Sequence, residues 1–599
     1  MVDENTAGRE PITIVEIDQD FCTLEYGVSP CAAAIGTTGG RKCFNTLYTC
    51  QDVANYDPAA LTLKFCTGSA SFPTNELIIP SITSVSTRPT EINIGGGDKS
   101  STPLGRRASI TVVFQDHPYN DKLVDKYRTE REYVALDNGT FWNKWLARNP
   151  YYQNRSIRIR SGYIGQELTD MQTRHYIIDK IDGPDSSGRV TLTAKDILKL
   201  ADDDRAQCPF PSTGKLDAAI DNDDTAVTLA PSGIGDDEYP SSGTAIIGSE
   251  IVTYTRVGDA VTLTARGQSG TTADSHDEDE TFQQVKVFSD VRVDAVIKTL
   301  LEDFANIPSS YIPYTDWQSE AGTYLAGYTL TTLITEPTGV STLIGELLQQ
   351  CICYIWWHEV EQKILFKAIR PTVASDGVIR TIDENSHIVA DSVRIERDST
   401  QRISQVWTYY NRFNPTESLT KAANYGQIDV RVDLPAETDN QYGESRIKRI
   451  YSRWLDDTNA GEVITTGTRL LTRYRDNPVY VYFSMDAKDR DIWVGDVIKF
   501  THRSFVNDIG TPFLTALQVI RAEEVEAGHR IEYKCQLYGF QLADNPGGNP
   551  GGFGSRYAYI RDNASDDYDM VTEDEKKFGG WISQNTGDFS DGGDAYRII

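Results

Sequence analysis

Histidine and methionine are scarce in this 599-residue sequence, with seven and four copies. No stretch approaches the roughly 20 apolar residues that cross a bilayer, and the opening MVDENTAGREP lacks the basic and apolar regions of a secretory signal. The signatures G-x-S-x-G and H-E-x-x-H are absent, so nothing argues for a hydrolase. We expect a non-enzymatic protein, without a transmembrane segment, that folds in a reducing cytoplasm where disulfides are uncommon.

Basic residues are few relative to acidic ones, 58 against 87, and the formal net charge is −29. Such a surface repels phosphates, which disfavours sequence-specific or general nucleic-acid binding. An acidic passage could still let DNA slide through without adhering. The acidic runs DNDD (221–224) and DSHDEDE (274–280) lack a complete calcium-loop frame and predict solvated loops.

Alternating apolar residues, together with 31 tyrosines and 9 tryptophans, predict a mainly β protein with some helix. In RRASITVVFQD, Ile110, Val112 and Phe114 fall on one face, as in a strand. Helical spacing is found near 290–305 and in STLIGELLQQ, and CICYIWWHEVEQKILFKAI predicts a β-hairpin.

Changes in composition divide the chain into six predicted segments, so the fold class is multidomain and mainly β (α+β). They are a Cys-rich segment (1–75), a first β domain (76–208), an inserted small β-barrel or sandwich (209–288), a mixed α/β domain (289–395), a second β-barrel related to the first (396–543) and a Gly/Pro-rich, then acidic, arm (544–599). We expect the arm to be extended and to order, if at all, on a partner.

Cysteine is also sparse, yet four of the nine copies lie within residues 22–50. Cys22, Cys31, Cys43 and Cys50 have the spacing C-x8-C-x11-C-x6-C, and Cys66 is a possible fifth member. Mononuclear zinc sites use tighter turns that aim two thiolates at one ion. Wider intervals suit an iron–sulfur cube, although common ferredoxin spacings are shorter. Metal or cluster binding, unpaired structural thiols and disulfides all stay open on spacing alone.

Several passages resemble the tail-tip hub proteins of long-tailed bacteriophages and gene transfer agents, relatives of the myophage baseplate hub. ITIVEIDQDFCTLEYGVSPC resembles the cysteine-bearing segment of the lambda-like minor tail protein L family, and GTFWNKWLARNPYY resembles the first hub domain. GTAIIGSEIVTYTR is similar to the inserted β module, and VGDVIKFTH is similar to the closing hub barrel. The resemblance extends over nearly all of residues 11–541.

The resemblance implies a structural 4Fe–4S cluster held by Cys22, Cys31, Cys43 and Cys50. The central interval is shorter than in the lambda-like pattern, so Cys66 is a possible substitute ligand. The resemblance also implies a homotrimeric ring at the tail tip of a virion, which closes the tail tube and matches its sixfold symmetry to a threefold fibre. Its partners would be the distal tail protein, the tape-measure protein and a central fibre or receptor-binding proteins, with DNA leaving through the lumen.

Two alternatives belong to other classes. An iron–sulfur redox protein would need a substrate pocket or a second redox centre, and the sequence has no flavin or nicotinamide fingerprint. A disulfide-bonded surface adhesin would need export, for which no signal is found.

Overall fold

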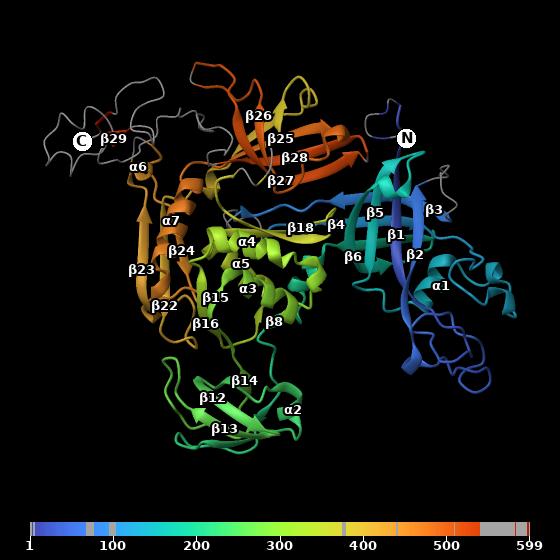
Figure 1. The fold of residues 1–599 in the computed structure, drawn as a ribbon, viewed down its shortest axis with the longest axis horizontal. Helices are drawn as coiled ribbons and strands as arrows, with labels where there is room; N and C mark the ends of the chain where they lie inside the picture. Colours follow the sequence, from blue (N-terminus) through green and yellow to red (C-terminus); the bar gives the residue numbers. More distant parts are fainter. Residues whose placement is uncertain are drawn as a thin grey trace.

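The architecture is taken from a computed structural model. It describes residues 8–67, 77–94, 104–373, 379–438, 441–507, 509–526 and 528–538, with Asp3, Thr6, Asp376 and the short strands β29 (Trp581–Ile582) and β30 (Tyr596–Arg597). The rest of the predicted arm 544–599 lies outside the described residues. Several β units and a helical layer follow one another along the chain (Figure 1), which confirms the predicted multidomain, mainly β fold class. Within the described ranges, no helix has both the length and the apolar character needed to cross a membrane.

The first unit is a closed barrel with strand order β1-β2-β3-β4-β7-β6-β5. Its core gathers Phe65, Phe114 and Trp142, with ring centroids of Phe114 and Trp142 4.8 Å apart. Trp142 belongs to α1 (Phe141–Arg148), so this helix packs its apolar side against the barrel core. The strands are β1 (Pro11–Cys22), β2 (Pro58–Thr67), β3 (Ile78–Arg88), β4 (Ser109–Gln115), β5 (Ser156–Tyr163), β6 (Gln172–Asp182) and β7 (Arg189–Lys195).

The predicted strand around Ile110 is confirmed as β4, whose Ile110, Val112 and Phe114 all enter the barrel core. The predicted division between residues 75 and 76 falls between β2 and β3, and these two strands pair in parallel. The Cys-rich segment therefore supplies two strands to the same barrel as the residues that follow it.

A small six-stranded sheet, with order β14-β11-β12-β13-β10-β9, occupies residues 215–284 of the predicted insertion 209–288. It has its own apolar core, which includes Leu229, Ile247, Tyr254 and Phe282, and it lies at the lower end of the molecule in Figure 1. Its elements are β9 (Lys215–Leu216), β10 (Ala226–Ala230), α2 (Ile234–Glu238), β11 (Ser242–Ile247), β12 (Glu250–Val257), β13 (Ala260–Ala265) and β14 (Phe282–Gln284).

Helices form the centre of the molecule. The helix predicted near 290–305 is confirmed as α3 (Val293–Thr299) and a π-helical turn (Leu300–Phe304), while residues 290–292 still belong to β15. STLIGELLQQ lies in α5 (Val340–Gln350), and the predicted hairpin is confirmed as β18 (Cys353–His358) and β19 (Lys363–Ala368). The other elements are β8 (Gln207–Cys208), β15 (Lys286–Arg292), α4 (Tyr314–Tyr324), β16 (Thr329–Ile334) and β17 (Thr338–Gly339).

A second six-stranded sheet packs beside the barrel, with order β20-β26-β27-β28-β25-β21. Its strands are β20 (Thr381–Asp383), β21 (Arg394–Arg397), β25 (Val479–Asp486), β26 (Val497–Thr501), β27 (Thr515–Glu526) and β28 (Arg530–Leu537). β20 and β21 come from the predicted segment 289–395 or its boundary, so this sheet is assembled across the predicted division.

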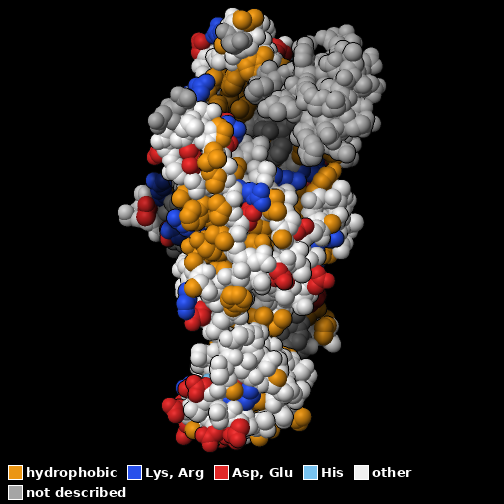
Figure 2. Space-filling model, turned by 90° about the vertical axis from the view of Figure 1, so that its left-hand side faces the viewer, with side chains coloured by type: hydrophobic (Ala, Val, Ile, Leu, Met, Phe, Trp, Pro, Cys, Tyr) orange, Lys and Arg blue, Asp and Glu red, His pale blue; other side chains and the backbone are white. Residues whose placement is uncertain are grey.

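A three-stranded sheet, β23-β22-β24, completes the fold. Its elements are β22 (Gln405–Arg412), β23 (Tyr425–Val432), α6 (Leu434–Glu437), β24 (Ile447–Tyr451) and α7 (Ala460–Tyr474). Val406, Ile450 and Leu470 join the sheet to α7 in one buried cluster. Apolar side chains gather on the side of the molecule shown in Figure 2. Ile428, Val430 and Val432 of β23 are exposed.

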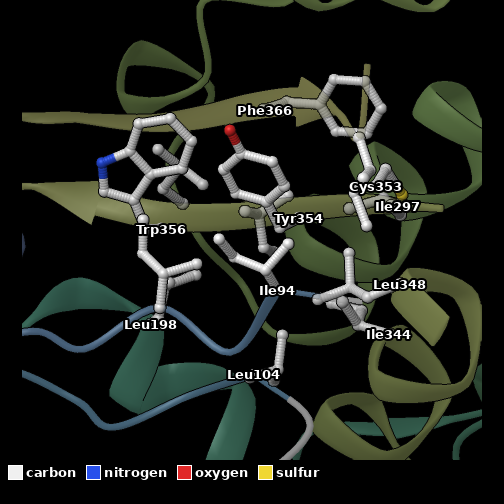
Figure 3. Close-up of a cluster of buried hydrophobic side chains, with 14 of the residues drawn as sticks. Ile94, Leu104, Leu198, Ile297, Ile344, Leu348, Cys353, Tyr354, Trp356 and Phe366 are labelled. Atoms are coloured by element: carbon white, nitrogen blue, oxygen red, sulfur yellow. The ribbon is translucent and has the colours of Figure 1, made fainter. Parts of the chain in front are cut away.

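One large core joins the helices to the second sheet. Figure 3 shows Ile94 and Leu104, from the segment between β3 and β4, among side chains of β18 and α5. Tyr354 and Trp356 of β18 are stacked with ring centroids 5.4 Å apart. Residues near the barrel thus enter the central core, which fixes the barrel against the rest of the chain.

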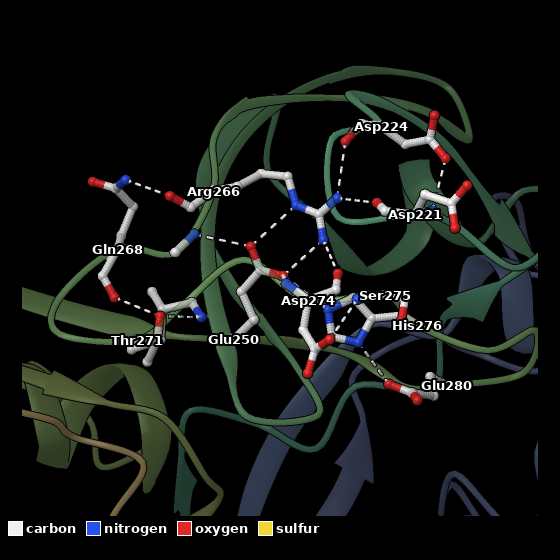
Figure 4. A network of polar contacts seen from close by, with 12 residues as sticks. Asp221, Asp224, Glu250, Arg266, Gln268, Thr271, Asp274, Ser275, His276 and Glu280 are labelled. Atoms are coloured by element: carbon white, nitrogen blue, oxygen red, sulfur yellow. Dashed lines mark hydrogen bonds and ion pairs between the residues drawn. The ribbon is translucent and has the colours of Figure 1, made fainter.

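The inserted sheet holds a fully buried carboxylate, Glu250 (Figure 4). Arg266 donates two hydrogen bonds to it, at 3.0 and 2.7 Å, and His276 Nε2 lies 2.9 Å from its Oε2. Burial raises the pKa of Glu250, but the hydrogen bonds from Arg266, His276 and the amides of Asp274 and Gly267 outweigh it and lower the pKa to about 2. The run DSHDEDE therefore contains a buried histidine, His276, in addition to its solvated acids.

Replacing Glu250 with glutamine should destabilise the inserted sheet by roughly 3–5 kcal/mol, because it leaves Arg266 buried without its partner charge. A carboxylate whose pKa is lowered on folding stabilises the fold above its unfolded pKa. That contribution should be lost as the pH falls from 4.5 towards 2, and Glu250→Gln should lack this part of the pH dependence. Hydrogen exchange of residues 215–284 measures the effect. Glu278→Gln, at an exposed position in the same loop, should leave exchange unchanged.

Candidate functional site

The four clustered cysteines converge on one small cavity. Cys22 ends β1, and Cys31, Cys43 and Cys50 come from the loop between β1 and β2. All four line the cavity, together with Tyr26, Asn45, Asp52 and other residues of the same loop. All nine cysteines of the chain are free thiols. The sequence-predicted set is therefore brought together in space.

Cys66 has a different environment. It lies on β2 opposite Ile14 and packs in an apolar cluster with Ile12, Leu168 and Met171. Burial raises the pKa of its thiol. Cys66 is absent from the residues that line the cavity of the other four.

Backbone contacts tie the cysteine loop to the end of β1. The amide of Cys22 donates to the carbonyl of Asn45 at 2.6 Å, and the amide of Ala32 donates to Asp52 Oδ2 at 2.7 Å. The amide of Asp52 also donates to the Cys50 sulfur at 3.4 Å. Hydrogen bonds to sulfur are among the features that tune iron–sulfur centres.

Two cations from the segment before α1 hold the same loop. Lys126 Nζ donates to the carbonyl oxygens of Cys22, Thr23 and Leu24 at 3.2, 3.0 and 3.3 Å. Arg131 donates to the carbonyl oxygens of Lys42 and Cys43 at 2.6 and 2.9 Å. These contacts hold the cysteine segment at its start and again at residues 42–43.

Arg131 is itself held in place. It forms a salt bridge with Asp125, and the two side chains are only 5% and 1% exposed. Arg131 and Arg148 also lie over the ring of Phe44, at 4.1 and 4.0 Å from its centroid. No motif in the sequence points to Lys126, Arg131 or Phe44. Lys126 and Arg131 lie in the basic run KYRTER (126–131), and such a run more often marks a solvated face.

Two of the four thiols, Cys43 and Cys50, have a raised pKa. Burial raises the pKa of Cys43, and the three neighbouring thiols raise it further. Burial also raises the pKa of Cys50, with Cys22 and Cys31 adding to the effect. A cysteine binds a metal as its thiolate, so metal binding at this site requires the thiols to lose their protons.

The resemblance implies a 4Fe–4S cluster as the group that these four cysteines would bind. Within the part of the chain that the structure describes, no group of three or more His, Cys, Asp or Glu side chains could hold a metal ion. Four thiols around one cavity, supplied by separate turns of a loop, nevertheless match an iron–sulfur cube in the kind and number of donors. The residues fit the cluster in the kind and number of donors alone, because the described side chains are not arranged as metal ligands.

Arg131→Ala should loosen the cysteine loop, because it leaves Asp125 buried without its partner and frees two carbonyl oxygens. Breaking a buried pair costs roughly 3–5 kcal/mol. Limited proteolysis should then cut within residues 32–49 faster than in the unaltered chain. Arg128→Ala, at an exposed position three residues earlier, should show no change. Equal cleavage in both variants would contradict the role given to Arg131.

No protein-family model matches the sequence, and no curated protein matches it either. Among solved structures, the chain is similar to the tail protein from Neisseria meningitidis MC58, with 12% identity and a TM-score of 0.36, over 74% of this chain and 92% of that one. The 43 kDa tail protein of prophage MuSo2 from Shewanella oneidensis matches with 9% identity and a TM-score of 0.34, over 77% and 98%. The prophage tail protein gp18 from Listeria monocytogenes EGD-e matches with 12% identity and a TM-score of 0.29, over 64% and 86%.

Proposed function

We propose that this chain is a structural protein of a phage-type tail, and more specifically the hub that forms a homotrimeric ring at the tail tip. The sequence passages that resemble tail-tip hub proteins extend over nearly all of residues 11–541. The observation that carries the proposal is the firm attachment of two β units within one chain, the barrel β1–β7 and the six-stranded sheet of β20, β21 and β25–β28.

Contacts of several kinds fix these two units together. The amide of Ile92 donates to the carbonyl of Ile520 at 2.9 Å, next to a bridge between Glu91 and Arg521. The Tyr163 hydroxyl donates to the carbonyl of Gly528 at 2.6 Å. Rigid pairing of this kind is what a ring subunit needs, because each copy must present both units at a constant angle.

The geometry of such a ring follows from symmetry. Three copies, each with two β units, would offer a pseudo-sixfold face to the tail tube and a threefold face to a central fibre. A ring of this type closes through heterologous contacts, in which each copy presents two different complementary surfaces. Its partners in the tail would be the distal tail protein, the tape-measure protein and a fibre or receptor-binding protein.

The ring would close the tube and rearrange for DNA to leave through its lumen. The net charge of −29 supports this role, because acidic walls repel phosphates and so keep DNA from adhering. No catalytic step is part of the proposal.

In the assembly, the cysteine cavity would have a structural role, which is to stabilise the loop between β1 and β2. Cys22, Cys31, Cys43 and Cys50 would hold a 4Fe–4S cluster, which supplies four metal–sulfur links between turns of the loop. Between β1 and β2 the regular structure is confined to a short 3₁₀ turn (Val53–Asn55). A segment of this kind gains stability from metal links that its small apolar core cannot supply.

Sedimentation of the purified full-length chain tests the proposal. We expect a trimer, or a monomer–trimer equilibrium that shifts to the trimer as the concentration rises. A strictly monomeric chain at all concentrations, with or without bound iron, would contradict it.

A further inference from the structure

One face of the three-stranded sheet is apolar and exposed. We call it the β23 face: Ile428, Val430 and Val432 of β23, Trp407 and Tyr409 of β22 and Tyr451 of β24. Tyr409 is paired with Ile428 and with Tyr451, and Trp407 is paired with Val430, so these side chains point to the same side of the sheet. Ile428, Val430 and Val432 are 47%, 46% and 38% exposed. The apolar area on this side of the molecule is visible in Figure 2.

The opposite face of the same sheet is already covered. Val406 and Ile450 pack there against Leu470 and Tyr474 of α7. Along β22 the alternation therefore places apolar side chains on both faces, which is typical of a strand buried on both sides, whereas the opposite face of β23 carries the polar residues Gln427, Asp429 and Arg431. Contiguous exposed apolar area of this kind commonly marks a binding surface.

β23 is also an edge strand. Among the described residues it pairs with β22 alone, so the backbone groups along its outer side have no strand partner there. An open edge beside an apolar face is a template for the addition of another strand.

The chain itself supplies a candidate strand in its C-terminal arm. The main fold ends at Tyr538, just after β28, and Arg473 of α7 donates to Gln536 Oε1 at 2.7 Å. The last described residues of the main fold therefore lie beside α7, the helix that underlies the three-stranded sheet. The residues 539–555 could span about 56 Å when extended. This is more than twice the length of α7, which is about 22 Å.

Within the arm, residues 556–561 (RYAYIR) have the sequence of a strand. Tyr557 and Tyr559 alternate with Ala558 and Ile560, and the stretch follows the Gly-rich GGFGS and precedes DNAS. The arm's later apolar residues in Trp581–Ile582 and Tyr596–Arg597 already pair with each other as β29 and β30.

We propose that residues 556–561 add to the outer edge of β23 in the same chain. The added strand would place Tyr557 and Tyr559 beside Ile428 and Val430, and so extend the β23 face by two aromatic rings. Aromatic and β-branched neighbours on adjacent strands stabilise a sheet. The proposal concerns a contact within one chain and does not depend on the proposed function.

Hydrogen exchange of the full-length chain tests the contact. Tyr557→Asp with Tyr559→Asp should raise the exchange of the β23 peptide 425–432 by about ten-fold, because the edge loses its added strand. Val430→Asp should in turn raise the exchange of 556–561. Tyr568→Asp, the same substitution elsewhere in the arm, is the matched control and should change neither.

Three outcomes would overturn the proposal. The first is exchange of β23 that is identical in the double variant and the unaltered chain. The second is protection of β23 that disappears on dilution, which would assign the occupant to a second copy. The third is protection that appears only after another protein is added.

Discussion

Replacing Cys43 with serine is expected to abolish the uptake of iron and sulfide by the purified chain. Cys43 lines the cavity with Cys22, Cys31 and Cys50, and a serine hydroxyl at this position cannot provide the thiolate that iron–sulfur clusters use. The measurement is anaerobic reconstitution with ferrous iron and sulfide, followed by iron and labile-sulfide analysis and visible absorbance. The substituted chain should remain near background in all three.

Cys66→Ser is the matched control, because Cys66 is a buried thiol of the same segment that lies in a separate apolar cluster. It should take up as much iron as the unaltered chain. Loss of iron in Cys66→Ser with retention in Cys43→Ser would reverse the assignment of ligands. Failure of the unaltered chain to take up iron would rule out the cluster.

Arg174→Ala should destabilise the junction between the barrel and the second sheet by roughly 3–5 kcal/mol. Arg174 of β6 forms salt bridges with Glu524 of β27 and with Glu359, and all three side chains are at most 6% exposed. Its guanidinium also lies 5.0 Å from the centroid of the Trp493 ring. Removing it leaves two carboxylates buried without a partner charge. Denaturant unfolding, monitored separately in the two units by hydrogen exchange, measures the loss.

The pH dependence distinguishes this mechanism from simple loss of packing. Burial raises the pKa of Glu359 to about 7, so this carboxyl is protonated at pH 5 even in the unaltered fold. Burial raises the pKa of Glu524, but Arg174, with a smaller contribution from the Gly528 amide, outweighs it and lowers the pKa. The destabilisation in Arg174→Ala should therefore be smaller at pH 5 than at pH 8. A loss that is equal at both values, or no larger than that of the exposed Arg189→Ala, would contradict this account.

Much of the fold could be predicted from local patterns. Period-two alternation located β4, and helical spacing located α3 and α5, because each pattern is complete within a few residues. Closure of the barrel could not be predicted this way. It depends on β1 pairing with β5, where Ile14 lies opposite Arg160, far apart in the sequence.

The cysteines were recognisable from the sequence because four of them lie within one short stretch. Their scaffold was not recognisable, because Lys126 and Arg131 act through backbone carbonyl oxygens, and such contacts leave no pattern of residue types. Glu250 was missed for a related reason. Its partners Arg266 and His276 lie in a loop whose acidic composition predicts solvation.

The most direct test of the account is to locate the chain in intact particles by electron microscopy with an antibody label on the inserted sheet, residues 215–284. The account predicts label at the distal end of the tail, in a ring with threefold symmetry. Particles that are complete without the chain, or label confined to the head, would contradict it.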